Sequence, residues 1–305
     1  MSDFKLTTPV AFIIFNRPDT TERVFAEIAK AQPTKLLVVA DGARTNKTGE
    51  AEKVAATRAI IQRVDWECEV LTNFSEKNLG CKNRVSSGID WIFEQVEEAI
   101  ILEDDCLPDP TFFRFCQEML ERYRHDQRIG IISGDNFQFG NRRNNDSYYF
   151  SKYVHIWGWA TWRDRWQGSY DVELRKWPSI RDDGWLLDIL GNSDEVKIWT
   201  DIFERMYKSK VDTWDYQWVF ANWVEGRMNV MPNVNLISNI GFGAGATHTV
   251  RDSHLANLPV NKMLFPIAHP VGVCRNLQAD TYTYTHCINV PIYKKLYNKV
   301  LGYFK

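Results

Sequence analysis

Short apolar runs alternate with helix-like segments along the first 135 residues, and this alternation restricts the possible folds more than any other feature. The clearest runs lie at residues 10–15, 36–40 and 99–102, a weaker one spans 69–72, and 129–132 closes the series. Strands that are apolar on both faces must be covered by helices on both sides. The pattern therefore predicts an α/β protein with a doubly wound, mostly parallel sheet and helices on both faces.

The segments between these runs have the periodicity of helices. Asp19 and Thr20 are suitable caps for the first of them. The second half of the chain is less regular: we expect a short hairpin at residues 228–237 and a Gly-rich, backbone-exposing stretch at 240–249. Helices are predicted at residues 19–31, 50–62, 85–96, 112–120, 182–190, 194–208 and 215–225.

Charge and cysteine usage exclude several classes of protein. The chain has 37 Lys and Arg against 39 Asp and Glu, a formal charge of -2, which gives no basic footprint for nucleic acid. It shows neither a leader peptide nor an apolar run of about 18 residues. The six cysteines have no CxxC or zinc-like spacing and are expected to be reduced thiols. These features predict a cytoplasmic protein.

Polar clusters follow three of the apolar runs: Asn16-Arg17, Asp41-Gly42 and Glu103-Asp104-Asp105. Ligands of doubly wound sheets bind at the carboxyl ends of the strands, so these clusters predict a ligand cleft. The three carboxylates at 103–105 would repel one another without a cation, and their hard oxygens suit Mg²⁺ or Mn²⁺. The alternative is a solvated acidic turn.

The two other clusters are also open to two interpretations. Asp41-Gly42 could be an ordinary turn, or its carboxylate could accept a hydrogen bond from a nucleobase. Arg17 could be a surface charge before Pro18, or a fork for phosphate or base.

Ten of the twelve tryptophans fall between Trp157 and Trp223. Aromatic faces stack on sugar rings, so this cluster could be a carbohydrate platform, although core packing explains about half of it. Trp214 and Trp218 share a helical face that is most often core. Asp215 lies between these aromatics, where partial desolvation would raise its pKa and suit a general base.

The C-terminal residues 292–305 combine an apolar helical face with four lysines. This pattern could bind an anionic membrane surface, which would make the protein peripheral at the inner face of the membrane. A terminal helix docked on the body, with solvated lysines, explains the pattern equally well. The apolar residues are Tyr293, Leu296, Tyr297, Val300, Leu301 and Phe304.

The sequence lacks the P-loop and Rossmann glycine motifs, and it has no GxSxG or HExxH. Four ordered stretches instead resemble the inverting GT-A glycosyltransferases around N-acetylglucosaminyltransferase I (family 13) and their bacterial relatives. The resemblance covers about residues 9 to 255. The stretches are AFIIFNRPDTTERV, VVADG, IILEDDCLPDPTFFRF and WDYQWVFANWVEGRMNVMPNVNLISNIGFGAGATH.

The resemblance implies a role for each matching position. Asp105 would be the direct metal ligand and Asp215 the catalytic base, although Tyr216 stands where the family has a second Asp. Further positions would contact the donor. Glu103 and Asp104 would contact the ribose and sugar, Arg17 and Asp41 would bind uracil, and Trp214 would lie beside the sugar. Thr247 and His248 would belong to the loop over the diphosphate, and Arg84, with Asn78 and Gly80, to a further donor loop. Trp157 and Trp159 are candidates for acceptor binding.

These observations together predict a metal-dependent, inverting glycosyltransferase with Mn²⁺ or Mg²⁺. The donor would be a UDP-sugar, most plausibly UDP-N-acetylhexosamine, and the acceptor a glycan or lipid-linked glycan of surface polysaccharide synthesis. Two alternatives stay open: a non-catalytic carbohydrate-binding protein and a sugar nucleotidyltransferase. With no internal repeat or linker, we expect one body with a nucleotide-sugar-binding half at 1–135, an acceptor-binding and catalytic half at 136–270, and a C-terminal extension at 271–305.

Overall fold

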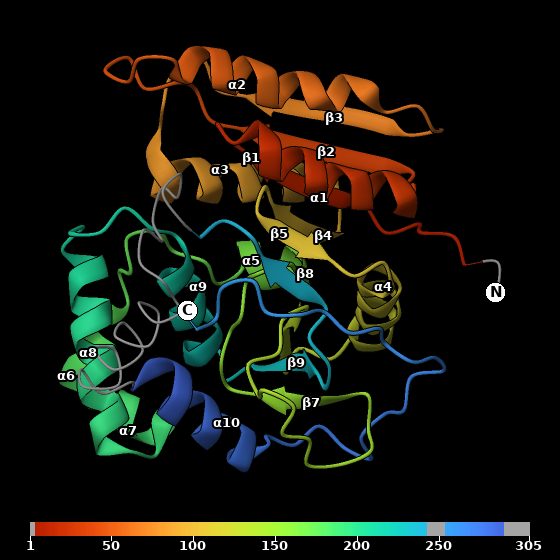
Figure 1. Cartoon of the computed structure of the whole chain (residues 1–305). Coiled ribbons are helices and arrows are strands. Elements are labelled where there is room, and N and C mark those ends of the chain that lie inside the picture. Colours follow the sequence, from red (N-terminus) through yellow and green to blue (C-terminus); the bar gives the residue numbers. More distant parts are fainter. Residues whose placement is uncertain (1–3, 243–253, 290–305) are drawn as a thin grey trace, which may run out of the picture.

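An eight-stranded sheet in the order β3-β2-β1-β4-β8-β6-β9-β7 forms the centre of the molecule (Figure 1). The computed structural model describes residues 4–242 and 254–289. Thr247, His248 and the basic tail at 292–305 lie outside these ranges.

The first four strands are parallel to one another, as the alternation predicted. They are β1 (Val10–Ile14), β2 (Lys35–Ala40), β3 (Glu69–Phe74) and β4 (Glu98–Glu103). The helices of this region are α1 (Pro18–Ala31), α2 (Glu50–Ala59), continued by a 3-10 turn at Ile60–Arg63, α3 (Gly80–Gln95) and α4 (Thr111–Tyr123). Each predicted strand and helix of this half is present, with ends that differ by a few residues.

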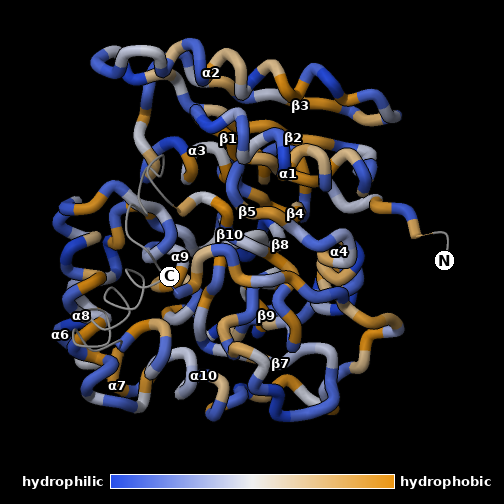
Figure 2. Tube along the Cα trace, viewed as in Figure 1, coloured by the Kyte–Doolittle hydropathy of each residue, from blue (hydrophilic) through white to orange (hydrophobic). Residues whose placement is uncertain are grey.

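Strand β1 shows why the sheet is covered on both faces. Val10 and Phe12 pack in one hydrophobic cluster with α1 and α4, whereas Ala11 and Ile13 pack in a second cluster with α3. Alternate side chains of a strand point to opposite faces, and all four of these residues are buried. Figure 2 shows the same arrangement, with hydrophobic residues along the inner strands. The predicted doubly wound α/β fold class is confirmed.

The second half extends the sheet with mixed strand directions. It contributes β6 (Ile129–Ser133), β7 (Tyr148–Ser151), β8 (Trp159–Trp162) and β9 (Met228–Pro232). Strand β8 lies between β4 and β6 and is antiparallel to both, so β6 runs in the same direction as β4. The sequence analysis did not predict β8, because its WATW sequence was interpreted only as part of the aromatic cluster.

The hairpin predicted at residues 228–237 is wrong. Strand β9 pairs with β6 and β7, whereas β10 (Ile237–Asn239) pairs with β5 (Cys106–Pro108) in a separate two-stranded sheet. The two strands of the expected hairpin thus belong to different sheets.

Helices fill the rest of the second half, in the green to blue part of Figure 1. They are α5 (Arg163–Gln167), α6 (Trp177–Asp182), α7 (Trp185–Leu190), α8 (Ser193–Tyr207), α9 (Asp215–Val224) and α10 (Leu277–Thr283), the last continued by a π-helical turn at Tyr284–Ile288. None of the described helices is both long and apolar enough to cross a bilayer. All six cysteines are free thiols.

Candidate active site

The carboxyl ends of β1, β2 and β4 meet at one edge of the sheet. The register pairs Ile14 with Ala40 and Ile13 with Glu103, so the residues that follow these strands start from neighbouring positions. The three polar clusters singled out in the sequence therefore share this edge, as expected for the ligand cleft of a doubly wound sheet.

Arg17 lies between the carboxylates that follow β4. Its Nη2 donates to Asp104 Oδ1 at 2.5 Å and to Asp105 Oδ2 at 2.9 Å. The backbone N–H of Phe15 donates to the second oxygen of Asp104 at 3.1 Å. Burial alone would lower the pKa of Arg17, but the two carboxylates outweigh this effect and raise it above its usual range. The guanidinium therefore carries a permanent positive charge at this edge.

Gly241 closes this ion cluster from the other side. The backbone N–H of Ile240 donates to the carbonyl of Asp105 at 2.9 Å, which continues the pairing of β10 with β5. A Cβ on Gly241 would lie 2.0 Å from Asp105 Oδ2 and 2.6 Å from Arg17 Nη1. Only glycine lets the chain pass this close to the two charged groups. The start of the Gly-rich stretch thus belongs to the candidate site.

Asp41 binds the N-terminus of helix α3. Its carboxylate accepts from the backbone N–H groups of Gly42, Leu79 and Gly80 and from the side chain of Asn78, at 2.9–3.1 Å. Burial raises the pKa of Asp41 above its usual range, while the backbone donors act in the opposite direction. The structure therefore joins Asp41 to Asn78 and Gly80, whereas Arg17, its expected partner at a uracil ring, bonds Asp104 and Asp105.

Arg84 also makes structural contacts. Its guanidinium donates to the backbone carbonyls of Ala40, at 3.2 Å, and Asn73, at 2.6 Å, and it is only 5% exposed. These bonds tie α3 to the ends of β2 and β3. They leave little of the side chain for the donor contact that the resemblance implied.

The carboxyl groups at the end of β4 repel one another. Burial, followed by repulsion from Asp105 and Asp104, raises the pKa of Glu103 to about 8, and Asp215 adds to the effect. Burial likewise raises the pKa of Asp104 to about 6, although Arg17 acts in the opposite direction. Each charge here is costly because it is desolvated and faces charges of its own sign. A further cation would relieve that repulsion.

A divalent cation at this edge would have to share its ligands with a phosphate group. No group of three or more His, Cys, Asp or Glu side chains within residues 4–242 and 254–289 is arranged to hold a metal ion by itself. Mg²⁺ and Mn²⁺ are commonly bound by one or two carboxylates together with substrate phosphates, and carboxylate oxygens are the ligands they prefer. Asp105 and its acidic neighbours can supply such ligands.

Asp215 is the first residue of α9. Its Oδ1 accepts a hydrogen bond from the hydroxyl of Thr213. Its charge contributes to the raised pKa of both Glu103 and Cys81, so the carboxylate lies near the end of β4 and the start of α3. The structure therefore brings Asp215 close to the acidic cluster, although 110 residues separate Asp105 from Asp215.

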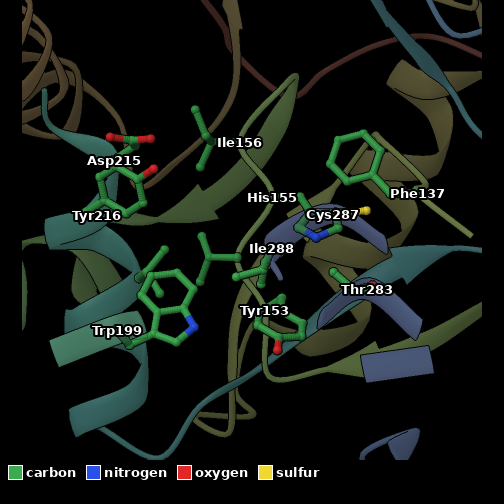
Figure 3. A pocket seen from close by; sticks show the side chains of 12 residues that line it. Phe137, Tyr153, His155, Ile156, Trp199, Asp215, Tyr216, Thr283, Cys287 and Ile288 are labelled. Atoms are coloured by element: carbon green, nitrogen blue, oxygen red, sulfur yellow. The ribbon is translucent and has the colours of Figure 1, made fainter. Parts of the chain in front are cut away.

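A pocket of about 160 Å³ opens beside Asp215 (Figure 3). Aromatic and aliphatic side chains form most of its wall, with Asp215 and Tyr216 on one side and Phe137 on the other. Complete small-molecule sites usually measure about 300–1,000 Å³, so this pocket is suited to one ring of a larger ligand.

Most of the tryptophan cluster is core. Trp159 is fully buried, with ring centroids 5.8 Å from Trp214 and 6.0 Å from Trp218, so it cannot be the sugar-stacking surface that the sequence predicted. Trp214 is 2% exposed and has little surface to offer a donor sugar. Trp157 is half-buried against Phe137 and Phe242 and remains a candidate. The eight buried tryptophans of the ten are Trp159, Trp162, Trp166, Trp177, Trp199, Trp214, Trp218 and Trp223.

Sequence reasoning missed three polar residues of this region. Asp212 accepts from the backbone N–H groups of Cys81 and Lys82 and so joins the loop before α9 to the start of α3. Asp135 and His155 form a buried pair beside the pocket, with 2.6 Å between Oδ1 and Nδ1. A signal existed only for Asp135, which follows the apolar run at 129–132 as the other polar clusters follow theirs.

Comparisons with known proteins add little to this site. No protein-family model matches the sequence, and no curated protein does. A solved UDP-glucose pyrophosphorylase complexed with UDP-glucose aligns at 12% identity over 48% of this chain and 62% of its own, with a TM-score of 0.25. A cytidylyltransferase from Leptospira borgpetersenii serovar Hardjo-bovis (strain JB197) aligns at 10% identity over 54% and 63%, with a TM-score of 0.30. Each match spans less than two thirds of the other protein, and our interpretation of the site rests on its own residues.

Proposed function

We propose that the protein is a metal-dependent, inverting glycosyltransferase that uses a UDP-sugar, in particular a UDP-N-acetylhexosamine. One observation carries the proposal: Arg17, the three carboxylates at 103–105 and Asp215 lie close together at the carboxyl edge of the sheet. A transferase of this kind needs a phosphate-binding cation and a base in the same cleft, and this arrangement supports both.

The ends of β1 and β4 would hold the donor diphosphate. Asp105 would bind Mn²⁺ or Mg²⁺ together with phosphate oxygens, and the bound ion would neutralise the charge of the departing diphosphate. Arg17 would then be able to exchange a carboxylate contact for a phosphate oxygen, which its planar fork of donors fits. Glu103 and Asp104 would accept hydrogen bonds from hydroxyl groups of the ribose and sugar.

Asp215 would act as the general base. It would accept the proton of an acceptor hydroxyl while that oxygen forms a bond to the anomeric carbon of the donor sugar. The bond from that carbon to the diphosphate breaks on the opposite face, UDP leaves, and the anomeric configuration inverts. The bond from Thr213 would hold the carboxylate in one orientation for this step.

The acceptor we propose is a hydroxyl of a glycan or lipid-linked glycan in surface polysaccharide or glycolipid synthesis. Residues 1–135 would bind the donor, 136–270 would complete the catalytic site and bind the acceptor, and 271–305 would be an extension. Attachment of the basic tail to the inner face of a membrane is part of this proposal and would be tested by sedimentation with anionic liposomes.

Calorimetric titration of UDP into the full chain tests the donor site. We expect binding with Mn²⁺, loss of binding in EDTA, and loss of binding in Asp105→Asn, which keeps the shape of the side chain. Asp183→Asn, on an exposed residue far from the site in sequence, is the control and should bind UDP normally. Binding that ignores both EDTA and Asp105→Asn would contradict the metal assignment.

The same protein would then be offered two reactions. A glycosyltransferase hydrolyses or transfers the sugar of a UDP-sugar, and ¹H NMR of the first product reports inversion. A sugar nucleotidyltransferase would instead require a nucleoside triphosphate and a sugar 1-phosphate. A non-catalytic carbohydrate-binding protein would bind saccharide and ignore UDP under both conditions.

A further inference from the structure

Asp135 and His155 form a polar pair at the same edge of the sheet as the proposed donor site. Strand β6 runs in the direction of β4, so Asp135, two residues beyond its end, emerges at the edge where Glu103 lies. His155 precedes β8 and comes from the opposite direction. Its Nδ1 lies 2.6 Å from Asp135 Oδ1. His155 is 9% exposed and Asp135 is 1% exposed. Such buried polar groups need a reason, because burial without full pairing is costly.

The orientation of the imidazole is held from two sides. Phe137 packs against the ring with 4.6 Å between centroids and 31° between planes, and the hydrogen bond to Asp135 determines the rotation of the ring. An ionised carboxylate can only accept, so the contact with Asp135 favours the His155 tautomer that has its hydrogen on Nδ1. In that tautomer Nε2 has the lone pair and can accept a hydrogen bond. The second oxygen of Asp135 has no hydrogen-bond partner among the described residues.

His155 and Asp215 both line this pocket, as Figure 3 shows. Its wall contains Phe137, Trp199 and Tyr216 and, within the described ranges, no lysine or arginine. A negatively charged ligand would be repelled by the carboxylate of Asp215 and by that of Asp135, which lies behind the imidazole. The described residues of the pocket wall offer no cation to balance the charge of such a ligand. A neutral ring with several hydroxyl groups can instead donate to both acceptors and pack its C–H face on the aromatic wall.

We propose that His155, positioned by Asp135, accepts a hydrogen bond from a hydroxyl of the acceptor sugar and that this pocket selects a neutral sugar ring over an acidic one. The inference rests on the proposed function in treating the bound sugar as an acceptor. The specificity would come from the Asp135–His155 pair and not from aromatic stacking alone. A ligand that lacks the matching hydroxyl would leave the buried acceptor of His155 without a hydrogen-bond partner, which is costly.

Saturation-transfer NMR on the full chain tests the selectivity. The probes are the methyl pyranosides of glucose, galactose, mannose and N-acetylglucosamine, with methyl glucuronide as the acidic comparison, each with and without UDP and Mn²⁺. We expect at least one neutral probe to bind at least about tenfold more tightly than methyl glucuronide. The proposal is overturned if no neutral probe binds under either condition, or if methyl glucuronide binds equally well.

Two variants test the role of the pair. His155→Phe retains the aromatic packing on Phe137 but lacks the acceptor, and it should weaken binding of the neutral probe about tenfold, the loss of one hydrogen bond. Asp135→Asn can donate to Nδ1 and so favours the tautomer with hydrogen on Nε2. We expect the ¹⁵N shifts of the two His155 ring nitrogens to exchange, together with a similar loss of affinity.

His125→Phe, on an exposed histidine after α4, is the control and should bind the probe normally. If Asp135→Asn does not fold, His155→Phe and the comparison of probes still decide the question. An unchanged affinity in His155→Phe overturns the proposal, because a merely structural histidine would behave in this way.

The result can be separated from that of the donor site. Saccharide binding that depends on His155 in a protein that ignores UDP would retain the pocket and reject the transferase. Metal-dependent UDP binding with no role for His155 would retain the transferase and reject the pocket.

Discussion

The two halves of the sheet use their conspicuous residues in opposite ways. In the parallel half, the polar residues after β1 and β4 gather at one edge, where Arg17, Asp104 and Asp105 form an ion cluster. In the mixed half, the conspicuous residues are tryptophans, and most of them are packed inside, as Trp159 and Trp166 are.

The difference follows from what each kind of residue loses in the interior. Charged groups are stable only near other charges or water, so their concentration at an edge indicates a place for a charged ligand. Tryptophan gains free energy from burial wherever it lies, and a cluster of tryptophans therefore predicts a core at least as well as a sugar platform.

Two arginines, one in each half, give the largest expected effect on stability: Arg17 is half-buried and Arg165 is buried. Arg17→Gln should lower the free energy of unfolding by about 3 kcal/mol, because Asp104 and Asp105 lose their balancing charge. Mn²⁺ should restore part of that loss, as a cation then faces the carboxylates. Arg165 instead donates to the backbone carbonyls of Tyr123, Arg124 and Asp126.

Arg165→Gln should therefore also lower the free energy of unfolding, but Mn²⁺ should restore none of that loss. Urea unfolding of both variants in Mn²⁺ and in EDTA makes the comparison. An equal metal response in the two variants would contradict the assignment of the first arginine to the ion cluster.

Asp215→Asn should reduce sugar transfer at least about a hundredfold, equal to about 2.7 kcal/mol in the barrier, with UDP affinity retained. The amide cannot accept the proton of the acceptor hydroxyl. Steady-state turnover and UDP calorimetry measure the two effects. Asp201→Asn, at an exposed position of α8, is the control, and unchanged turnover in Asp215→Asn would remove the base assignment.

Two tryptophans separate core from candidate ligand surface. Trp159→Phe should lower the free energy of unfolding by about 2 kcal/mol, because it leaves a cavity among Trp166, Trp214 and Trp218. Trp157→Phe, at a half-buried position, should cost less. Urea unfolding measures both, and a larger cost for the second variant would reverse our assignment of the two residues.

Glu50→Gln is expected to have a smaller effect, about 1–2 kcal/mol near pH 7. The hydrogen bond with Arg44 lowers the pKa of Glu50 to about 2, below the unfolded value of about 4.3. A lowered pKa gives stability that is fully present above about pH 4.3 and lost as the pH falls toward 2. The difference between wild type and variant should shrink across that window in urea unfolding.

Glu204 in the second half is the matched test. Its pKa is also lowered to about 2, first through the hydrogen bond from Lys208, but its side chain is more exposed than that of Glu50. Glu204→Gln should therefore cost less because solvent screens the interaction. An equal loss in both variants would show that burial does not decide the strength of these pairs.

Much of the first half could be predicted from local pattern. Alternation of side chains along β1 identifies a strand buried on both faces, and the polar residues after β4 indicate the edge where ligands bind. The same reasoning was incomplete for Asp135, which follows β6 in the same way but stands before a region without clear periodicity. It failed for the segment at 228–237, whose two strands have partners far away in sequence.

The sequence by itself therefore determined the α/β class, most strands and helices of the first half and the polar residues at its strand ends, because burial patterns are properties of a few consecutive residues. Only the tertiary structure decided that β8 lies between β4 and β6, that Arg17 bonds Asp104 and Asp105, and that Asp135 meets His155 beside Asp215. Each of these contacts joins segments that are distant in the chain. Their pairing depends on the packing of the whole molecule, which no local pattern records.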